Sequence, residues 1–127
     1  MQLDTVRIFV SDVNRSKQFY EDVLGLNLET DGSEYGFLVF CSGSVKLLVD
    51  NSESADETTG ELLIGRFTGI SFKVPNIYKR YETLISSGVD FLDPPQKQPW
   101  GGLIASFKDI DNNILPIVQS PSTASRK

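Results

Sequence analysis

The fold is decided by a stretch near the end of the sequence, Pro94–Gln119, which reads PPQKQPWGGLIASFKDIDNNILPIVQ. Its prolines stiffen the first part, because each one fixes φ and lacks a backbone donor. The two glycines after Trp100 allow a bend before the apolar run 103–107. The residues Asp111-Asn112-Asn113 tolerate positive φ, which a tight turn requires, and the run 114–118 follows them. The stretch therefore predicts a loop, a strand, a turn and a strand, with Trp100 at the exit of the loop.

A strand followed by a capped helix occurs twice in the chain. Val10-Ser11-Asp12-Val13 matches Val74-Pro75-Asn76-Ile77, which begins 64 residues later. Asp12 and Asn76 are suitable N-cap residues, since their side-chain oxygens accept from early helical N–H groups. Gly25 and Gly88 end the two predicted helices. The second helix is expected to bury an apolar face that contains Ile77, Tyr81, Leu84 and Ile85.

Short β-rich runs separated by turn residues surround both helices. They predict the strands Val6–Val10, Leu26–Glu29, Tyr35–Phe40, Val45–Val49, Ile70–Val74 and Val89–Leu92, with turns at Asp31-Gly32-Ser33 and Cys41-Ser42-Gly43. Together with the C-terminal pair, the order β-α-β-β-β appears twice. We expect one domain over 1–127, built from a first module at 5–50, an exposed connector at 51–66, a second module at 67–119 and a flexible tail at 120–127.

Composition excludes several classes of protein. The chain has 127 residues and a net charge of −5, which argues against a nucleic-acid-binding protein. Its apolar runs are too short to span a bilayer, and we expect no membrane contact and no leader segment. A single Cys precludes an internal disulfide and favours the reducing cytoplasm. The sequence contains no His, the side chain most used as a general base and metal ligand.

Two stretches carry a resemblance to a known family. WGGLIASFKDIDNNILPIVQ at the C-terminal end and IFVSDVNRSKQFYEDVLGL near the start resemble the vicinal-oxygen-chelate superfamily, which includes glyoxalase I, bleomycin-resistance proteins, fosfomycin-resistance enzymes and extradiol dioxygenases. The chain is most similar to the bleomycin-resistance-like branch, where Trp-Gly-Gly occupies this point. The resemblance covers most of residues 5 to 119. It implies an α+β fold of two tandem βαβββ modules, whose curled half-barrel sheets surround a ligand-binding cleft.

The resemblance also implies where a metal would bind. Enzymes of the superfamily hold a divalent metal with side chains from four strands, and the matching positions here are Thr5, Leu48, Gly69 and Pro116. Leu, Gly and Pro have no side-chain donor atom, and a neutral Thr hydroxyl is a poor ligand for a transition metal. We therefore expect no metal, no cofactor and no catalytic residue, and we argue against the metal-dependent chemistry of the superfamily.

Trp100 is the leading candidate for ligand contact. It is either a platform that stacks on a planar or cationic ligand, or an anchor in the core or in a dimer interface. Strand alternation nominates further residues that line the cleft. The predicted ligand-binding set is Trp100, Arg7, Phe9, Leu48, Asp50, Ser71, Lys73, Gly102 and Pro116.

Arg7 and Cys41 each have competing interpretations. Arg7 either forms an internal ion pair, for which Asp50 is the candidate, or captures an anionic group. Arg7 and Lys73 together argue against a cationic ligand. Cys41 has no His to activate it as a nucleophile, so a semi-buried structural role in a turn is favoured.

The function favoured by the sequence is metal-independent binding of a small planar or amphipathic molecule, resembling the drug-sequestering bleomycin-resistance proteins. One alternative is a glyoxalase-type lyase or isomerase whose metal ligands lie elsewhere in the sequence. A second is a structural or regulatory dimer without a ligand. A homodimer is expected in each case, because open sheet edges favour pairing.

Overall fold

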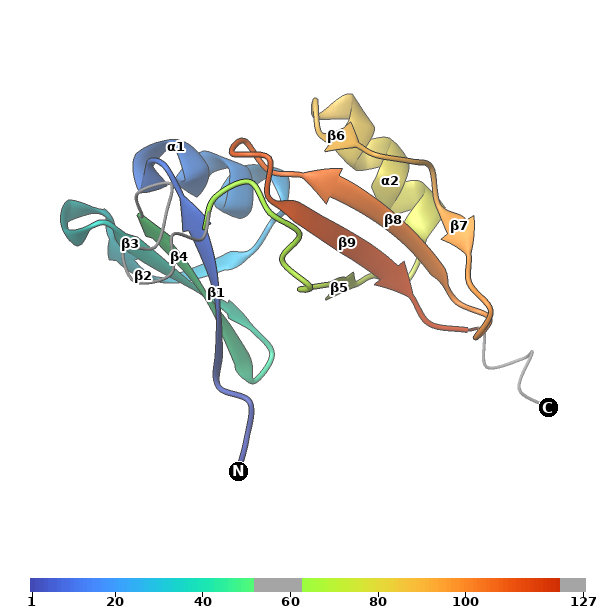
Figure 1. The fold of residues 1–127 in the computed structure, drawn as a ribbon, viewed down its shortest axis with the longest axis horizontal. Coiled ribbons are helices and arrows are strands. Elements are labelled where there is room, and N and C mark those ends of the chain that lie inside the picture. The colour runs from blue at the N-terminus through green and yellow to red at the C-terminus, as the bar shows by residue number, and fades with distance from the viewer. Residues whose placement is uncertain (52–62, 122–127) are drawn as a thin grey trace. The chain divides into compact units, whose positions relative to one another are not determined.

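The computed structural model describes residues 1–51 and 63–121 of the chain. These form two compact units, one with residues 1–51, 63–66 and 110–113 and the other with residues 67–109 and 114–121. Figure 1 shows the ribbon of both. Each unit contains an open mixed sheet and few helices, so the α+β class expected from the sequence is confirmed.

Unit 1 begins with strand β1 and ends its sheet with strand β4. Its elements are β1 (Thr5–Val10), α1 (Val13–Gln18), a π-helical turn (Phe19–Val23), β2 (Asn27–Gly32), a 3-10 turn (Ser33–Tyr35), β3 (Phe37–Ser42) and β4 (Val45–Asn51). The strand order is β1-β4-β3-β2. Strands β1 and β4 are parallel, whereas the pairs β4–β3 and β3–β2 are antiparallel.

Unit 2 repeats this arrangement with shorter strands. Its elements are β5 (Phe72–Lys73), α2 (Ile77–Ser86), β6 (Asp90–Phe91), β7 (Gln96–Lys97), β8 (Leu103–Lys108) and β9 (Ile114–Gln119). The order is β5-β9-β8-β6, with β7 also paired to β8. Again the first strand runs parallel to the last one. The repeat seen in the sequence therefore corresponds to a repeat in topology.

One face of each sheet is buried against the helix of its own unit. In unit 1 the Tyr20 and Phe40 rings lie 6.0 Å apart between helix and sheet. In unit 2 Phe91 contacts Tyr81 at 4.7 Å and Phe107 at 5.6 Å, measured between ring centroids. Each fully buried side chain of this size contributes about 1.5–3 kcal/mol. The buried strand residues on these faces are Ile8, Val10, Leu38, Phe40, Leu47 and Val49 in unit 1, and Ala105, Phe107, Leu115 and Ile117 in unit 2.

The predicted helix boundaries are confirmed by the capping geometry. The Asp12 carboxylate accepts from the Asn14 N–H at 2.9 Å, and the Asn76 side chain accepts from the Lys79 N–H at 3.2 Å. Gly25 and Gly88 follow the helices with φ of 74° and 88°, a conformation that glycine adopts without strain.

A long-range contact also fixes the start of each helix. The Asn51 side chain, at the end of β4, accepts from the Val13 N–H at 2.8 Å. The Gln119 side chain, at the end of β9, accepts from the Ile77 N–H at 2.8 Å. In both units the last strand therefore satisfies a backbone donor in the first turn of the helix, a group that has no partner inside the helix.

The C-terminal hairpin is confirmed, including its turn. Asn112 has φ of 65°, the left-handed conformation expected for this position. Asn113 is fully buried within unit 1, where its amide donates to the Phe9 carbonyl at 2.8 Å and accepts from the Gly65 N–H at 2.9 Å. Asp111 accepts from the Ser11 hydroxyl at 2.6 Å.

Three local predictions are wrong. Asp31 and Gly32 belong to β2, and the chain turns instead at Ser33–Tyr35, followed by Gly36 with φ of 86°. Cys41 and Ser42 belong to β3, so the turn there begins two residues later, at Gly43. Ile85 is 44% exposed and lies off the buried face of α2, because Ile77 and Leu84 already fill the contact with the sheet.

The strand lengths also differ from the prediction. The strand expected over 70–74 is reduced to β5, and the loop before Trp100 contains the short strand β7, which was missed. The connector and the tail fall largely on residues 52–62 and 122–127, outside the described part of the chain. Within the described residues, no helix has the length and apolar character needed to cross a bilayer.

Candidate functional site

The face of the first sheet opposite α1 is only partly covered, and we call it open face 1. It is defined by Thr5, Arg7, Phe9, Phe37, Val39, Cys41, Lys46, Leu48 and Asp50. The strand register places Phe9, Asp50 and Phe37 in one row, and Arg7, Leu48 and Val39 in the next. The four residues predicted in unit 1 as ligand contacts thus lie together on one surface.

Arg7 on this face has the partner that the sequence suggested. Its Nε lies 3.9 Å from Oδ2 of Asp50, and its guanidinium lies 5.7 Å from the centre of the Phe9 ring. The Arg7 side chain is 54% exposed, so the ion pair is screened by water and weak. Open face 1 therefore has matched charges, since Lys46 also lies 3.6 Å from Glu29 on the neighbouring strand β2.

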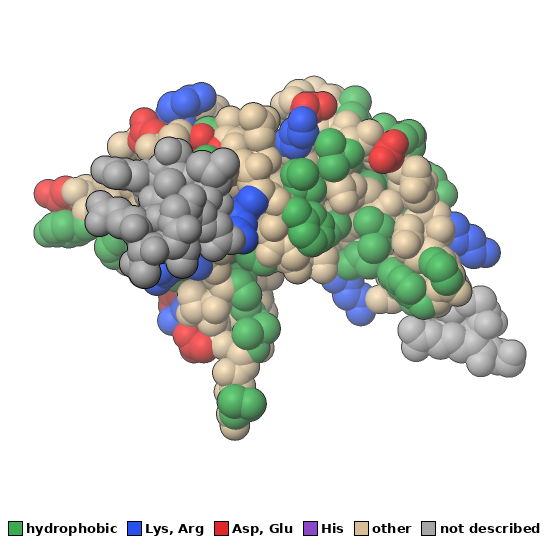
Figure 2. Space-filling model, viewed as in Figure 1, with side chains coloured by type: hydrophobic (Ala, Val, Ile, Leu, Met, Phe, Trp, Pro, Cys, Tyr) green, Lys and Arg blue, Asp and Glu red, His purple; other side chains and the backbone are tan. Residues whose placement is uncertain are grey.

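The face of the second sheet opposite α2 is called open face 2. It carries Lys73, Ile104, Ser106, Lys108, Ile114, Pro116 and Val118, and Gly102 comes just before β8. Lys73 pairs with Val118, which pairs with Ile104, so one cation and two aliphatic side chains form a row. Figure 2 shows hydrophobic side chains at the surface over β8 and β9. Ser71, predicted as a contact, lies just before β5 and alternates onto this face with Lys73.

Trp100 lies at the tip of the hairpin formed by β7 and β8. The Gly101 N–H donates to the Gln98 carbonyl at 2.9 Å, and the Gln98 N–H donates to the Gly102 carbonyl at 2.8 Å. Gly101 has φ of 93°, so the turn closes with a left-handed glycine. The sequence Gln-Pro-Trp-Gly-Gly suits this turn, because proline is favoured at the second position of such a turn. Trp100 is therefore held by a defined turn.

The indole ring of Trp100 lies directly on Gly102. A Cβ atom added at Gly102 would come within 1.8 Å of the ring, a distance that no real contact allows. Gly102 directly precedes β8 and lies two residues before Ile104, so strand alternation continued by one residue places the ring on the side of open face 2. Trp100 nevertheless stays 51% exposed. One side of the indole is packed on the backbone, and much of the rest is accessible.

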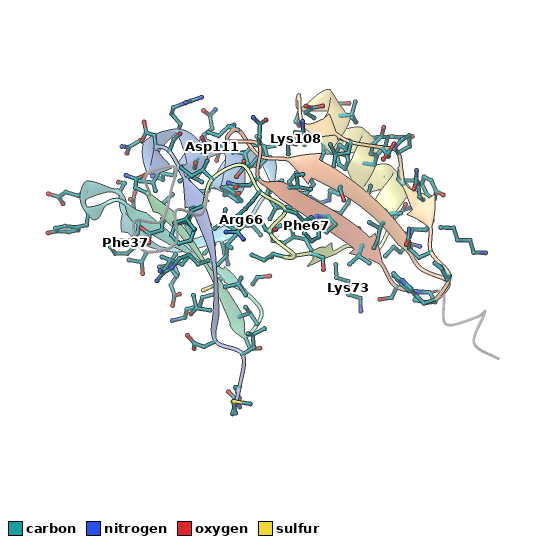
Figure 3. All side chains as sticks on the ribbon, viewed as in Figure 1. Phe37, Arg66, Phe67, Lys73, Lys108 and Asp111 are labelled. Carbon is teal, nitrogen blue, oxygen red and sulfur yellow. The ribbon has the colours of Figure 1, made fainter. Side chains whose placement is uncertain are left out.

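Open face 1 contains a similar aromatic–glycine pair, which was not predicted from the sequence. Phe37 is the cross-strand partner of Gly32, and a Cβ at Gly32 would lie 2.3 Å from the Phe37 ring. Figure 3 labels Phe37 on this sheet. The pairing depends on the register of β2 and β3, which no local sequence pattern encodes. An aromatic ring over a strand glycine is a recurring way to cover exposed backbone.

The four positions implied for a metal do not fit one. The Thr5 hydroxyl donates to the Asp4 carboxylate at 2.6 Å, and Leu48 faces open face 1 with an aliphatic side chain. Gly69 has φ of 72°, so a ligand side chain there would also strain the backbone. Pro116 is buried in β9. Within residues 1–51 and 63–121, no three His, Cys, Asp or Glu side chains are grouped to hold a metal.

Cys41 is unsuited to nucleophilic chemistry. A hydrogen bond with Glu29 raises the pKa of the Cys41 thiol, and desolvation adds to this effect. A raised pKa reduces the fraction of reactive thiolate at neutral pH. Cys41 is partly buried in β3, so the semi-buried role expected from the sequence agrees with its surroundings, although its expected place in a turn does not.

Comparison with known proteins identifies relatives over most of the chain. The family model of the Glyoxalase/Bleomycin resistance protein/Dioxygenase superfamily matches residues 2–117. The uncharacterized protein YraH of Bacillus subtilis strain 168 is 31% identical over 124 residues, which cover 92% of this chain and 97% of YraH. A crystal structure of a superfamily member from Sphaerobacter thermophilus has a TM-score of 0.77 and 28% identity, with 94% of this chain and 98% of that chain covered.

Two further structures share the fold at lower identity. TnmS3, an antibiotic binding protein from Streptomyces, has a TM-score of 0.77 and 24% identity over 96% of this chain and 97% of its own. Lactoylglutathione lyase from Agrobacterium tumefaciens has a TM-score of 0.73 and 16% identity over 93% and 92%. The same fold thus supports binding in one protein and catalysis in another, and the side chains present must decide between them.

Proposed function

Because the chain belongs to the glyoxalase/bleomycin resistance protein/dioxygenase superfamily, we propose that it binds small planar aromatic molecules without a metal. In this respect it would resemble the bleomycin-resistance proteins of the superfamily. The observation that carries the proposal is the indole of Trp100, which is seated on Gly102 and half exposed on an aliphatic sheet face.

The physical basis of binding is stacking combined with apolar burial. A planar ligand would stack on the accessible side of the indole and cover Ile104 and Val118, which share its face. Aromatic pairs contribute about 0.5–1.5 kcal/mol beyond the burial of their area. Because the turn holds Trp100 in place before the ligand arrives, little side-chain entropy is lost on binding.

The side chains argue against the catalytic alternative. A glyoxalase-type lyase needs a metal or a base, and this sequence contains no His. The implied metal positions offer one hydroxyl, that of Thr5, and this group already donates to Asp4. Because the lyase from Agrobacterium tumefaciens shares this fold, catalysis is the alternative function against which the experiment is designed.

Fluorescence titration tests the proposal, because Trp100 is the single Trp of the chain. We expect naphthalene-type probes to change its emission in a saturable way in EDTA-treated protein. Trp100→Ala should weaken binding measured by calorimetry at least about tenfold, given the loss of stacking and burial. Tyr78→Ala is the matched control, since Tyr78 is 53% exposed on α2 of the same unit. The absence of saturable binding with every probe would refute the proposal.

We also propose that the protein is a homodimer in the cytoplasm. The strands β1 and β2 are the edges of the first sheet, and β5 and β6 end the strand order of the second. Unpaired edges favour association with another copy. Light scattering coupled to gel filtration should then report twice the chain mass of 14.1 kDa. The ligand-binding cleft between the two modules remains a prediction from the sequence.

A further inference from the structure

Open face 2 carries positive charge beside the Trp100 platform. Lys73 is exposed at the end of β5, in the row that continues through Val118 to Ile104. Gly102, under the indole, directly precedes β8 and lies two residues before Ile104 in the chain. Since neighbouring strands are about 4.8 Å apart, two strand spacings place β5 about 10 Å from β8. The Lys73 ammonium is therefore within reach of a molecule that stacks on Trp100.

A second lysine lies at the other end of the same face. Lys108 pairs with Ile114 at the start of β9, whereas Lys73 pairs with Val118 near its end. Figure 3 labels Lys108 at the end of β8 and Lys73 beside β5, below β9. The four residue-to-residue steps from Ile114 to Val118 correspond to about 13 Å of strand. The apolar part of open face 2 thus has a lysine at each end.

The charges on the two open faces differ. On open face 1, Arg7 and Lys46 have carboxylate partners within 4.0 Å. Among residues 1–51 and 63–121, neither Lys73 nor Lys108 has a carboxylate at that distance. Asp90 is the register neighbour of Lys108, and no acidic residue is the register neighbour of Lys73. Positive charge is thus placed beside an apolar platform in a protein whose net charge is −5.

From this arrangement we infer that the ligand of open face 2 is an aromatic anion. Its planar body stacks on Trp100, and its carboxylate or sulfonate is paired with Lys73. The inference rests on the proposed function and specifies the ligand class. An ammonium in this position would repel the cationic group of an amine ligand, because like charges at short range are unfavourable.

Three probes with one aromatic body separate charge from stacking. They are naphthalene-2-carboxylate, the neutral naphthalene-2-carboxamide and the cationic 2-naphthylmethylammonium. Calorimetry should rank the carboxylate first, about three- to fivefold tighter than the carboxamide, as expected for a partly exposed ion pair. The ammonium probe should bind most weakly. The preference for the carboxylate should decrease as salt is added.

Two lysine variants provide the test and its control. Lys73→Gln should remove the preference for the carboxylate and leave carboxamide binding within about twofold. Lys97→Gln should keep the preference, since Lys97 pairs with Leu103 and alternates to the face of the sheet that meets α2. Both lysines are exposed, so circular dichroism should show folded variants.

Each outcome has a defined meaning. Equal affinities for all three probes, or the same loss in both lysine variants, would overturn the aromatic-anion inference while leaving the proposed function intact. No binding of any probe would overturn both. A preference for the carboxylate that is lost only in Lys73→Gln supports both.

Discussion

The side-chain oxygen of Gln119 accepts a hydrogen bond from the backbone N–H of Ile77 at 2.8 Å. This contact ties the end of β9 to the first residue of α2, as Asn51 ties the end of β4 to Val13. The bond holds the helix against one face of its sheet. The position of α2 therefore determines which side chains of β8 and β9 are buried and which belong to open face 2.

Gln119→Ala should lower the free energy of unfolding by about 1 kcal/mol, since it removes one intramolecular hydrogen bond. Gln96→Ala is the control, because Gln96 is exposed on β7. Urea denaturation of both variants measures the difference. Equal effects in the two variants would show that the bond to Ile77 adds nothing to stability.

Asn113 and Asn112 should respond very differently to substitution. Asn113→Ala leaves the Phe9 carbonyl and the Gly65 N–H without their buried partner and should cost about 2–3 kcal/mol. Asn112→Gly should change stability by less than about 0.5 kcal/mol or raise it, since φ is 65° there. Thermal denaturation of the two variants provides the measurement. A stable Asn113→Ala protein would contradict the role assigned to this side chain.

Gly102→Ala should displace the indole from open face 2. The new methyl group would overlap the Trp100 ring and approach the Gln119 carbonyl at 2.6 Å, so the ring or the strand must move. We expect a shift of the Trp emission toward that of fully exposed indole, together with weaker binding of aromatic probes. An unchanged emission spectrum would mean that the ring does not rest on Gly102 in solution.

Stability at low pH should depend on Asp31. Hydrogen bonds from the Ser33 hydroxyl and the Ser33 N–H, followed by Lys17, lower the pKa of this exposed carboxyl from 3.8 to about 2. Because the pKa of this carboxyl is lower in the folded than in the unfolded protein, its ionised form stabilises the fold at pH values above the unfolded-state pKa. This contribution is lost as the pH falls from about 4 toward 2. The difference in urea midpoint between the wild type and Asp31→Asn should therefore shrink over this range. A difference that is constant with pH would contradict the assignment.

The sequence was sufficient to predict features that depend on neighbouring residues. Asp12 and Asn76 cap helices because an N-cap acts within one turn, and Asn112 adopts positive φ because the hairpin turn is local. The internal repeat then implied the same topology in both halves. These local signals are sufficient to predict the α+β class.

Other features depend on contacts between distant segments, and no local pattern reveals them. The bond between Gln119 and Ile77 joins residues 42 positions apart. The ring of Phe37 covers Gly32 only because β2 and β3 pair in one register. Glycine usually marks turns, so the sequence predicts a turn at Gly32, whereas in the structure Gly32 belongs to β2 and makes room for the ring.

The candidate site was predictable only in part. Strand alternation correctly grouped Arg7 with Phe9 and Leu48 with Asp50, since side chains two residues apart share a face. The seat of Trp100 on Gly102 depends on the turn at Gln98–Gly101, whose pairing strand β7 was missed.

The most direct test compares ligand affinity with and without metal. Calorimetric titration of naphthalene-2-carboxylate into EDTA-treated protein should give the same dissociation constant, within about twofold, as titration after addition of equimolar Ni²⁺ or Zn²⁺. Binding that appears only after a metal is added would contradict the proposal that apolar burial and stacking on Trp100 suffice.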